Sequence, residues 1–259
     1  MSDWLILLLL IIATCAVIFV IVQLRHRRTS VGDQVADPTE TPDVIEYMTM
    51  MVGVVYAIVL GLAIAGVWEE RGAAEEWVRQ EAQALHELGE RAQAFPAASQ
   101  EGVRESVEAY VGYTVDEEWP YMIDNEGLSE EGDLLFAAVR QSVAALEPFT
   151  APESYAYEGM HHQLATASEA RTSRGMSAES TLPGVVWLGL ITGAVVVVGM
   201  LFALQIRRTG RELLLAGLFS ALIVFLLYLI WHFDAPFARG LSDSTEAFRT
   251  LFPQVLPDE

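Results

Sequence analysis

The chain has 259 residues, 53% of them hydrophobic, and a positive mean hydropathy of +0.33. This is more apolar surface than one soluble core would bury, so we expect a soluble domain beside a membrane region. The 35 acidic residues outnumber the 15 basic ones and give a formal charge of −20. That balance argues against binding nucleic acid or docking on anionic lipid through a basic face. The single cysteine, Cys15, cannot form an intrachain disulfide.

Four segments are long and apolar enough to cross a bilayer, which takes roughly 20 apolar residues. In chain order they are 4–24, about 44–68, 182–206 and 213–233. The first lacks the basic start and the small-residue cleavage site of a signal peptide, and a basic stretch follows it at 25–28. We therefore expect it to be a retained membrane anchor.

Arginine positions predict the orientation, because short positively charged loops stay in the cytoplasm. The basic stretches lie at 25–28, after the first span, and at 207–211, between the third and fourth. One four-span topology puts both inside, and it places both termini and residues 69–181 outside the plasma membrane. The expected regions are a first span with a basic cytoplasmic end (1–28), a cytoplasmic loop (29–43), a second span (44–68), an acidic outer bundle (69–181), the third and fourth spans with a short basic cytoplasmic loop (182–233) and an outer C-terminal tail (234–259).

The outer region contains 23 acidic and 7 basic residues between 69 and 181, a net charge of −16. Prolines and N-cap residues divide it into four expected helices. The first helix continues the second span as far as Pro96, and the second runs from Ser99 to Trp119-Pro120. The third runs from 129 to 146, and the fourth leads from Pro152 towards Leu182-Pro183. The predicted fold is an all-α membrane protein with four transmembrane helices and a four-helix extracytoplasmic bundle continuous with spans two and three. A short amphipathic helix in the tail, with Phe248 and Phe252, is expected to fold against the bundle or the lipid headgroups.

Two helices of this bundle place charges on their apolar seams. Glu81 occupies a position of the first helix where leucine is expected, and Arg171 and Arg174 lie on the inner seam of the fourth. At 1.5 Å per residue, Glu81 and Arg171 both stand roughly 18–20 Å from the membrane edge. We predict a buried Glu81–Arg171 ion pair, with Arg174 nearby, that sets the register of the two helices. The alternative is that these side chains emerge at the edge of the bundle.

Small residues recur on the spans, at every fourth position of the second and as Gly189-x-x-x-Gly193 in the third. Such ridges mark close helix approach, either within one subunit or between subunits. No acid or base lies near mid-membrane, which disfavours a proton-driven transporter and leaves a channel with an apolar constriction. The candidate pore or packing residues are Glu46, Thr49, Gly53, Tyr56, Ala57, Leu60, Gly61 and Ala65, and the candidate outer-mouth residues are Trp68, Glu69, Glu70 and Asp234.

Motifs for enzyme chemistry are weak in this chain. Glu158 and His162 have metal-ligand spacing on a helix, but two ligands are too few and a solvated helix face explains them. A phosphate-binding loop, a nucleophile elbow, an EF-hand and a metalloprotease motif are all missing. A cluster of aromatic and acidic residues could hold a cation or form a core edge; its members are Tyr110, Tyr113, Glu117, Glu118 and Trp119. We expect no enzyme activity, no cofactor and no metal.

A series of short motifs resembles the family of bestrophin-like domain proteins over residues 45–250. The motifs are Gly53-x-x-Tyr56-Ala57-x-x-Leu60-Gly61, Trp68-Glu69, Glu81-Ala82, Glu118-Trp119-Pro120, Arg171-x-x-Arg174, Leu182-Pro183 and Asp234-x-Pro236-Phe237. The resemblance implies kinship with the bestrophins, which are pentameric chloride channels. Two features depart from them, because the arginines place the helical region outside the cell and its charge would repel chloride.

Family resemblance and charge together favour a homo-oligomeric ion channel that prefers cations, with an acidic outer vestibule and a path lined by the second span. The alternatives are a non-conducting sensor or scaffold of the cell envelope, and a bestrophin-like anion channel. The expected partners are the lipid bilayer, further copies of the chain and inorganic ions, and not nucleic acid.

Overall fold

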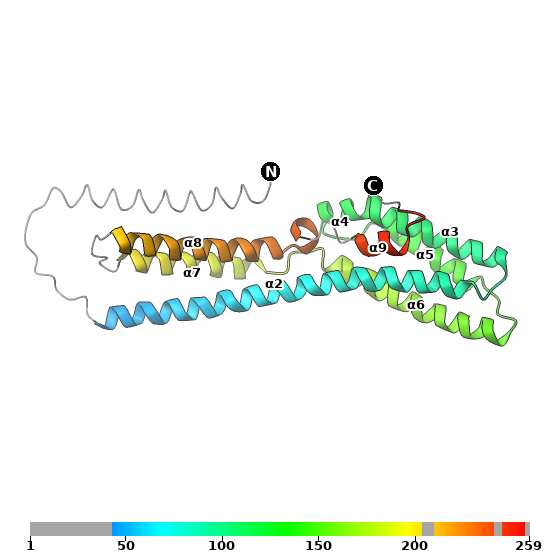
Figure 1. The fold of residues 1–259 in the computed structure, drawn as a ribbon, viewed down its shortest axis with the longest axis horizontal. Helices are drawn as coiled ribbons and strands as arrows, with labels where there is room; N and C mark the ends of the chain where they lie inside the picture. Colours follow the sequence, from blue (N-terminus) through cyan, green and yellow to red (C-terminus); the bar gives the residue numbers. More distant parts are fainter. Residues whose placement is uncertain (1–42, 204–209, 241–244, 257–259) are drawn as a thin grey trace, which may run out of the picture. The chain divides into compact units, whose positions relative to one another are not determined.

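The computed structural model describes residues 43–203, 210–240 and 245–256, and this part of the chain contains helices joined by short loops and no β-strand (Figure 1). The elements are α2 (Asp43–Ala92), α3 (Ala97–Tyr113), the π-helical turn η1 (Thr114–Glu118), α4 (Trp119–Asn125), α5 (Glu130–Ala144), α6 (Ala151–Met176), α7 (Gly184–Ala203), α8 (Gly210–Phe233), a second π-helical turn η2 (Pro236–Gly240) and α9 (Glu246–Leu251). The expected first span at 4–24 and the basic stretch at 25–28 lie outside the described residues, as do Arg207 and Arg208.

The chain divides into two compact units. The membrane unit runs as far as Val67 and again from Leu182 to His232, and the bundle unit comprises Trp68–Thr181 and the segment from Phe233 onward. Helix α2 contributes to both, because it continues without a break from Asp43 to Ala92. No proline interrupts this stretch of 50 residues, so every residue within it can supply the backbone N–H that a continuous helix needs.

Three helices of the described chain are long and apolar enough to span a bilayer: α2, α7 and α8. Most of their large apolar side chains are exposed, among them Val54, Ile58 and Leu62 on α2 and Leu188 and Ile191 on α7. A helix satisfies its own backbone hydrogen bonds and can therefore present such a surface to lipid. The structure thus confirms an all-helical fold in the described residues, with three candidate membrane-spanning helices at the second, third and fourth expected spans.

The bundle unit packs α3, α5 and α6 with the second half of α2 around one apolar core. Helices α3 and α5 meet through Tyr110 and Phe136, whose ring centroids are 5.2 Å apart. Helix α5 begins after Ser129, which accepts the backbone N–H of Gly132, and α6 begins with a complete capping box between Thr150 and Glu153. The C-terminal segment also packs here, since Phe248, Phe252 and Leu256 are buried in the same core.

Two expected helix boundaries are wrong. The second outer helix does not end at Trp119-Pro120: the chain stays helical through η1 and α4 as far as Asn125. Pro120 is tolerated at the second position of α4, and the N–H of Trp119 reaches back to the carbonyl of Thr114 across the π turn. The fourth outer helix does not lead unbroken into the third span, because α6 ends at Met176 and α7 begins only at Gly184. Continuity with the spans therefore holds for α2 alone.

Candidate functional site

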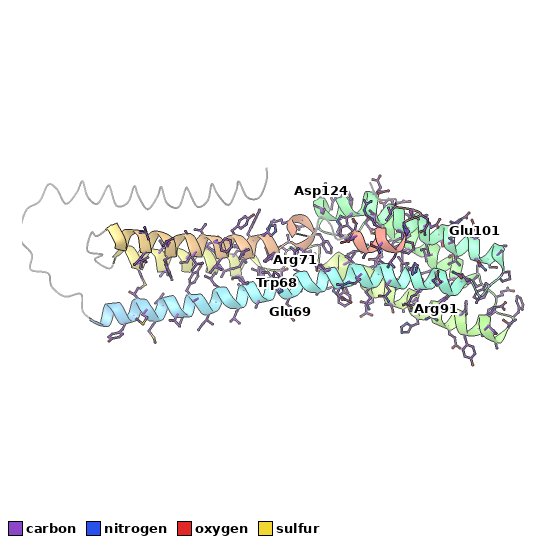
Figure 2. All side chains as sticks on the ribbon, in the orientation of Figure 1. Trp68, Glu69, Arg71, Arg91, Glu101 and Asp124 are labelled. Carbon is purple, nitrogen blue, oxygen red and sulfur yellow. The ribbon has the colours of Figure 1, made fainter. Side chains whose placement is uncertain are left out.

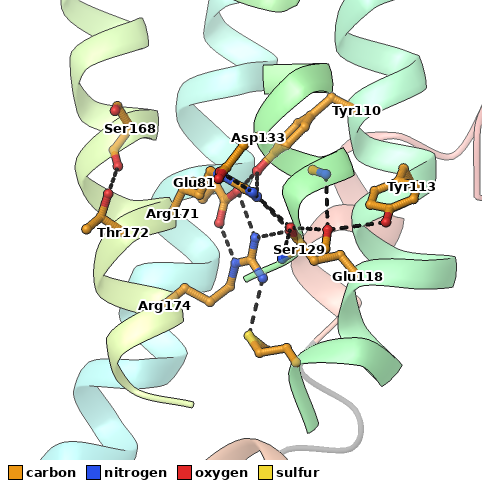
Figure 3. Close-up of polar contacts among 12 residues, drawn as sticks. Glu81, Tyr110, Tyr113, Glu118, Ser129, Asp133, Ser168, Arg171, Thr172 and Arg174 are labelled. Carbon is orange, nitrogen blue, oxygen red and sulfur yellow. Dashed lines mark hydrogen bonds and ion pairs between the residues drawn. The ribbon is translucent and has the colours of Figure 1, made fainter. Parts of the chain in front are cut away.

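Five polar side chains form an ion cluster inside the bundle unit (Figure 3). Glu81 comes from α2, Tyr110 from α3, Glu118 from η1, and Arg171 and Arg174 from α6. All five are at most 3% exposed. Charges so deeply buried require partners, because an unpaired buried ion costs several kcal/mol.

Glu81 pairs with Arg174. The Nε of Arg174 donates to one carboxylate oxygen at 2.7 Å, and its Nη2 donates to the other at 3.3 Å. The hydroxyl of Tyr110 also donates to Glu81 and accepts a hydrogen bond from Nη1 of Arg171 at 3.0 Å. Burial and the charge of Glu81 raise the pKa of Tyr110, so this phenol stays protonated and acts as a donor.

Glu118 accepts hydrogen bonds from three residues. Arg171 donates from Nη1 and Nη2 to the two carboxylate oxygens, at 2.6 and 2.8 Å, and Arg174 adds a contact of 2.9 Å. Ser129 donates from its hydroxyl at 3.0 Å and its backbone N–H at 3.3 Å. Burial alone would raise the pKa of Glu118, but the hydrogen bonds and charges of the two arginines outweigh it and lower the pKa to about 2.

The first turn of α5 approaches this carboxylate so closely that only glycine fits at position 132. A Cβ atom on Gly132 would lie 2.0 Å from Oε1 of Glu118 and 2.8 Å from Nη2 of Arg171. The absence of a side chain therefore allows the cluster to form against the helix backbone.

The cluster reaches solvent at one side. Arg171 also donates from Nη2 to Asp133 at 2.9 Å, and the side chain of Asp133 is 69% exposed. Inside, every carboxylate oxygen of Glu81 and Glu118 has at least one donor. The arrangement cross-links four helical segments, and the buried carboxylates offer no free oxygen that could coordinate a ligand. The role of the cluster is therefore structural.

The structure brings together the charged residues that the sequence singled out, but with different partners. Glu81 pairs with Arg174, whereas Arg171 pairs with Glu118, so the predicted Glu81–Arg171 pair is wrong. The prediction counted residues along an unbroken helix from Pro183, and residues 177–183 are not helical. Tyr110 and Glu118 belonged to the aromatic and acidic cluster considered for a cation, and in the structure they face internal arginines.

The candidate residues on α2 divide between two faces. Tyr56 and Leu60 are 7% and 3% exposed and, with Val67, form the buried seam of this helix in the membrane unit. The small residues Ala57, Gly61 and Ala65 form a row on another face and are exposed, whereas Gly53, seven residues before Leu60, lies beside the seam and is half-buried. A Cβ atom on Gly53 or Gly61 would meet nothing within 4 Å among the described residues. Thr49 is half-buried, and the side chain of Glu46 lies outside the described part.

The candidate outer-mouth residues have different environments within the bundle unit. Trp68 is 61% exposed, and its ring meets Phe233 edge-on at 5.2 Å. Glu69 is exposed, and Glu70 accepts a hydrogen bond from the hydroxyl of Ser177 at 3.2 Å. Asp234 is only 3% exposed, and its backbone carbonyl accepts the N–H of Thr181 at 2.9 Å. Glu69 is therefore the most accessible carboxylate of this set.

Carboxylates dominate the surface of the bundle unit. Glu101 and Asp124 lie on its outside (Figure 2), and several arginines pair with neighbouring acids on the same helix, as in Arg104 with Glu101 and Glu108. The two buried arginines balance Glu81 and Glu118, so the net −16 of residues 69–181 resides outside the core. Glu158 and His162 are both exposed, and no group of three metal-ligand side chains occurs within the described ranges.

Apolar spanning helices and an acidic helical bundle held by a buried ion cluster define a helical membrane protein. A model of the bestrophin-like domain matches residues 4–248, nearly the whole chain, and the chain belongs to this family. Comparisons with curated proteins and with solved structures give no match.

Proposed function

We propose that this protein is one subunit of a homo-oligomeric ion channel that prefers cations, with α2 lining the ion path. The observation that carries the proposal is the division of α2 into two faces. Tyr56 and Leu60 pack inside the protomer, while Ala57, Gly61 and Ala65 remain exposed. Small residues let helices approach one another or leave room for a path, and membership of a family akin to the bestrophins favours conduction.

The charge of the bundle unit supports the preference for cations. A net −16 concentrates cations and repels anions at the surface of the domain. The buried arginines do not offset this surface charge, because Glu81 and Glu118 neutralise them. In this proposal the bundle stands outside the cell, the orientation that the arginine stretches favour.

Flux from liposomes tests the proposal directly. Purified full-length protein should release potassium, sodium or calcium faster than chloride and should form an oligomer in detergent. A strict monomer, or silence under varied voltage and pH, would contradict the channel and favour a non-conducting sensor or scaffold. Faster chloride flux would favour an anion channel.

Charge reversal tests where the path begins. Glu46→Arg, Glu69→Arg and Glu70→Arg should each lower the ratio of cation to chloride flux, because these carboxylates flank the apolar part of α2. Glu158→Arg, on an exposed position of α6, is the matched control: it removes the same charge from the bundle unit away from the apolar part of α2 and should change the ratio less. Equal ratios in all four variants would rule out a path along α2.

A further inference from the structure

Tyr56 makes a polar contact between two membrane helices. Its hydroxyl donates to the backbone carbonyl of Leu190 on α7 at 2.8 Å, and the side chain is 7% exposed. In hydrocarbon a donor that loses its partner finds no water to replace it. The contact therefore favours one orientation of the Tyr56 side chain with respect to α7.

The ring of Tyr56 fits against α7 because residue 193 is glycine. A Cβ atom on Gly193 would lie 2.5 Å from Cε2 of the ring and 2.6 Å from Cδ2, closer than any real contact. Gly189, one turn earlier, has no such neighbour within 4 Å in the described part of the chain. Within the Gly189-x-x-x-Gly193 motif, the ring of Tyr56 therefore packs against Gly193 and not against Gly189.

This contact fixes which face of α2 turns towards α7. Leu60 and Val67 follow Tyr56 at positions four and eleven residues later, which fall on the same side of a helix. Ala57 and Gly61 each come one residue after a seam position and so lie about 100° around the axis. Turning α2 to bring the small residues against α7 would break the Tyr56 hydrogen bond and withdraw the ring from Gly193.

We infer that Tyr56 and Gly193 form a positioning pair that sets the rotation of α2 about its axis. The pair keeps Tyr56 on α7 and its seam with Leu60 and Val67 buried in the membrane unit, and it turns the row Ala57, Gly61 and Ala65 to the ion path. The second part of this inference rests on the proposed function. The first part concerns helix packing alone and is tested separately.

Thermal unfolding of the full-length protein in detergent tests the pair without reference to conduction. Gly193→Ala should lower the melting temperature and Gly189→Ala should not. In a Tyr56→Ala background, Gly193→Ala should have little further effect, because the clashing ring is gone. Tyr56→Phe keeps the ring and loses only the hydrogen bond, so Gly193→Ala should still lower the melting temperature there. Equal melting temperatures for Gly193→Ala and Gly189→Ala would overturn the pair and leave the proposed channel untouched.

Cysteine labelling tests the rotation. In a Cys15→Ser background, single cysteines replace Ala57, Gly61, Leu60 and Val67, and a water-soluble cationic thiol reagent is applied to protein in liposomes. Thiolates in a water-filled path should react about tenfold or more faster than thiols buried in the membrane unit. The expected pattern is fast labelling at 57 and 61 and slow labelling at 60 and 67, with the contrast reduced by Gly193→Ala and kept by Gly189→Ala.

The outcomes separate the two hypotheses. Fast labelling at 60 and 67 instead, or a contrast that survives Gly193→Ala, would overturn the positioning role. Slow labelling at all four positions, with the melting result as expected, would refute the ion path along this row and keep the packing pair.

Discussion

Replacing Gly132 by alanine should break the buried ion cluster. The new methyl group would lie 2.0 Å from Oε1 of Glu118, so that carboxylate would have to move by more than about 1 Å. Glu118 cannot move freely, because Ser129, Arg171 and Arg174 all bind it. Hydrogen bonds to charged groups contribute about 1.5–3 kcal/mol each, and breaking a buried pair costs about 3–5 kcal/mol.

A smaller opposing effect comes from helix propensity, since alanine in place of glycine stabilises a helix by at most about 1 kcal/mol. The net loss for Gly132→Ala should therefore be about 2–4 kcal/mol. For a chain of this size that corresponds to a fall in melting temperature of roughly 5–15 °C.

The assay is thermal unfolding of the full-length protein in detergent at neutral pH, followed by circular dichroism. Gly102→Ala on α3 is the matched control, because that glycine is exposed and its added Cβ meets nothing within 4 Å in the described chain. It should leave the melting temperature unchanged or raise it slightly. A Gly132→Ala protein that melts at or above the wild-type temperature would show that the cluster is not packed as tightly as the geometry indicates.

Three further predictions concern the same unit. The pKa of Glu118 is about 2 in the folded protein against an ordinary value of 4.5, so its ionised form stabilises the fold above pH 4.5. This contribution, about 3 kcal/mol, is lost as the pH falls from about 5 towards 2. The Glu118→Gln variant should therefore show a flatter acid side in a plot of melting temperature against pH. Glu81→Gln and Arg174→Gln should each cost about 3–5 kcal/mol and together less than their sum, whereas strictly additive losses in denaturant unfolding would contradict a direct pair. Phe252→Ala should cost about 3–5 kcal/mol in the same assay, because the ring of Phe252 is only 4% exposed. Phe149 is 83% exposed, so Phe149→Ala is the control and should change stability by less than about 0.5 kcal/mol. Equal effects of the two substitutions would show that the C-terminal segment does not pack in the core.

Local patterns of the sequence predicted the helical elements well. Hydropathy located the apolar parts of α2, α7 and α8, since a run of about 20 apolar residues has few other uses. The absence of proline predicted the unbroken α2, and Ser129 correctly indicated the start of α5. The heptad seam identified Glu81, Arg171 and Arg174 as inward-facing because each interrupts an apolar series.

The partners within the cluster could not be predicted in the same way. Pairing Glu81 with Arg174 depends on where α6 ends, and nothing local distinguishes a helix that stops at Met176 from one that continues to Pro183. Glu118 faces inward because the π turn at Thr114–Glu118 adds a residue to one turn of helix, which shifts the following side chains around the axis. The requirement for glycine at 132 arises from Glu118 and from Arg171, which is distant in the chain and meets Gly132 only in the folded bundle.

The ion cluster and the surface of α2 have different physical roles. A buried network whose carboxylates are all bonded contributes specificity of packing, because any shift of α2 against α6 leaves a charge without a partner. It cannot also bind a ligand without losing those bonds. In the proposed channel, ions would therefore meet groups that the described part of the fold leaves open, such as the surface carboxylates of the bundle unit and the small-residue row of α2. Variants of the cluster should consequently change stability first, and variants of Ala57, Gly61 or Glu69 should change ion flux in a protein that still folds.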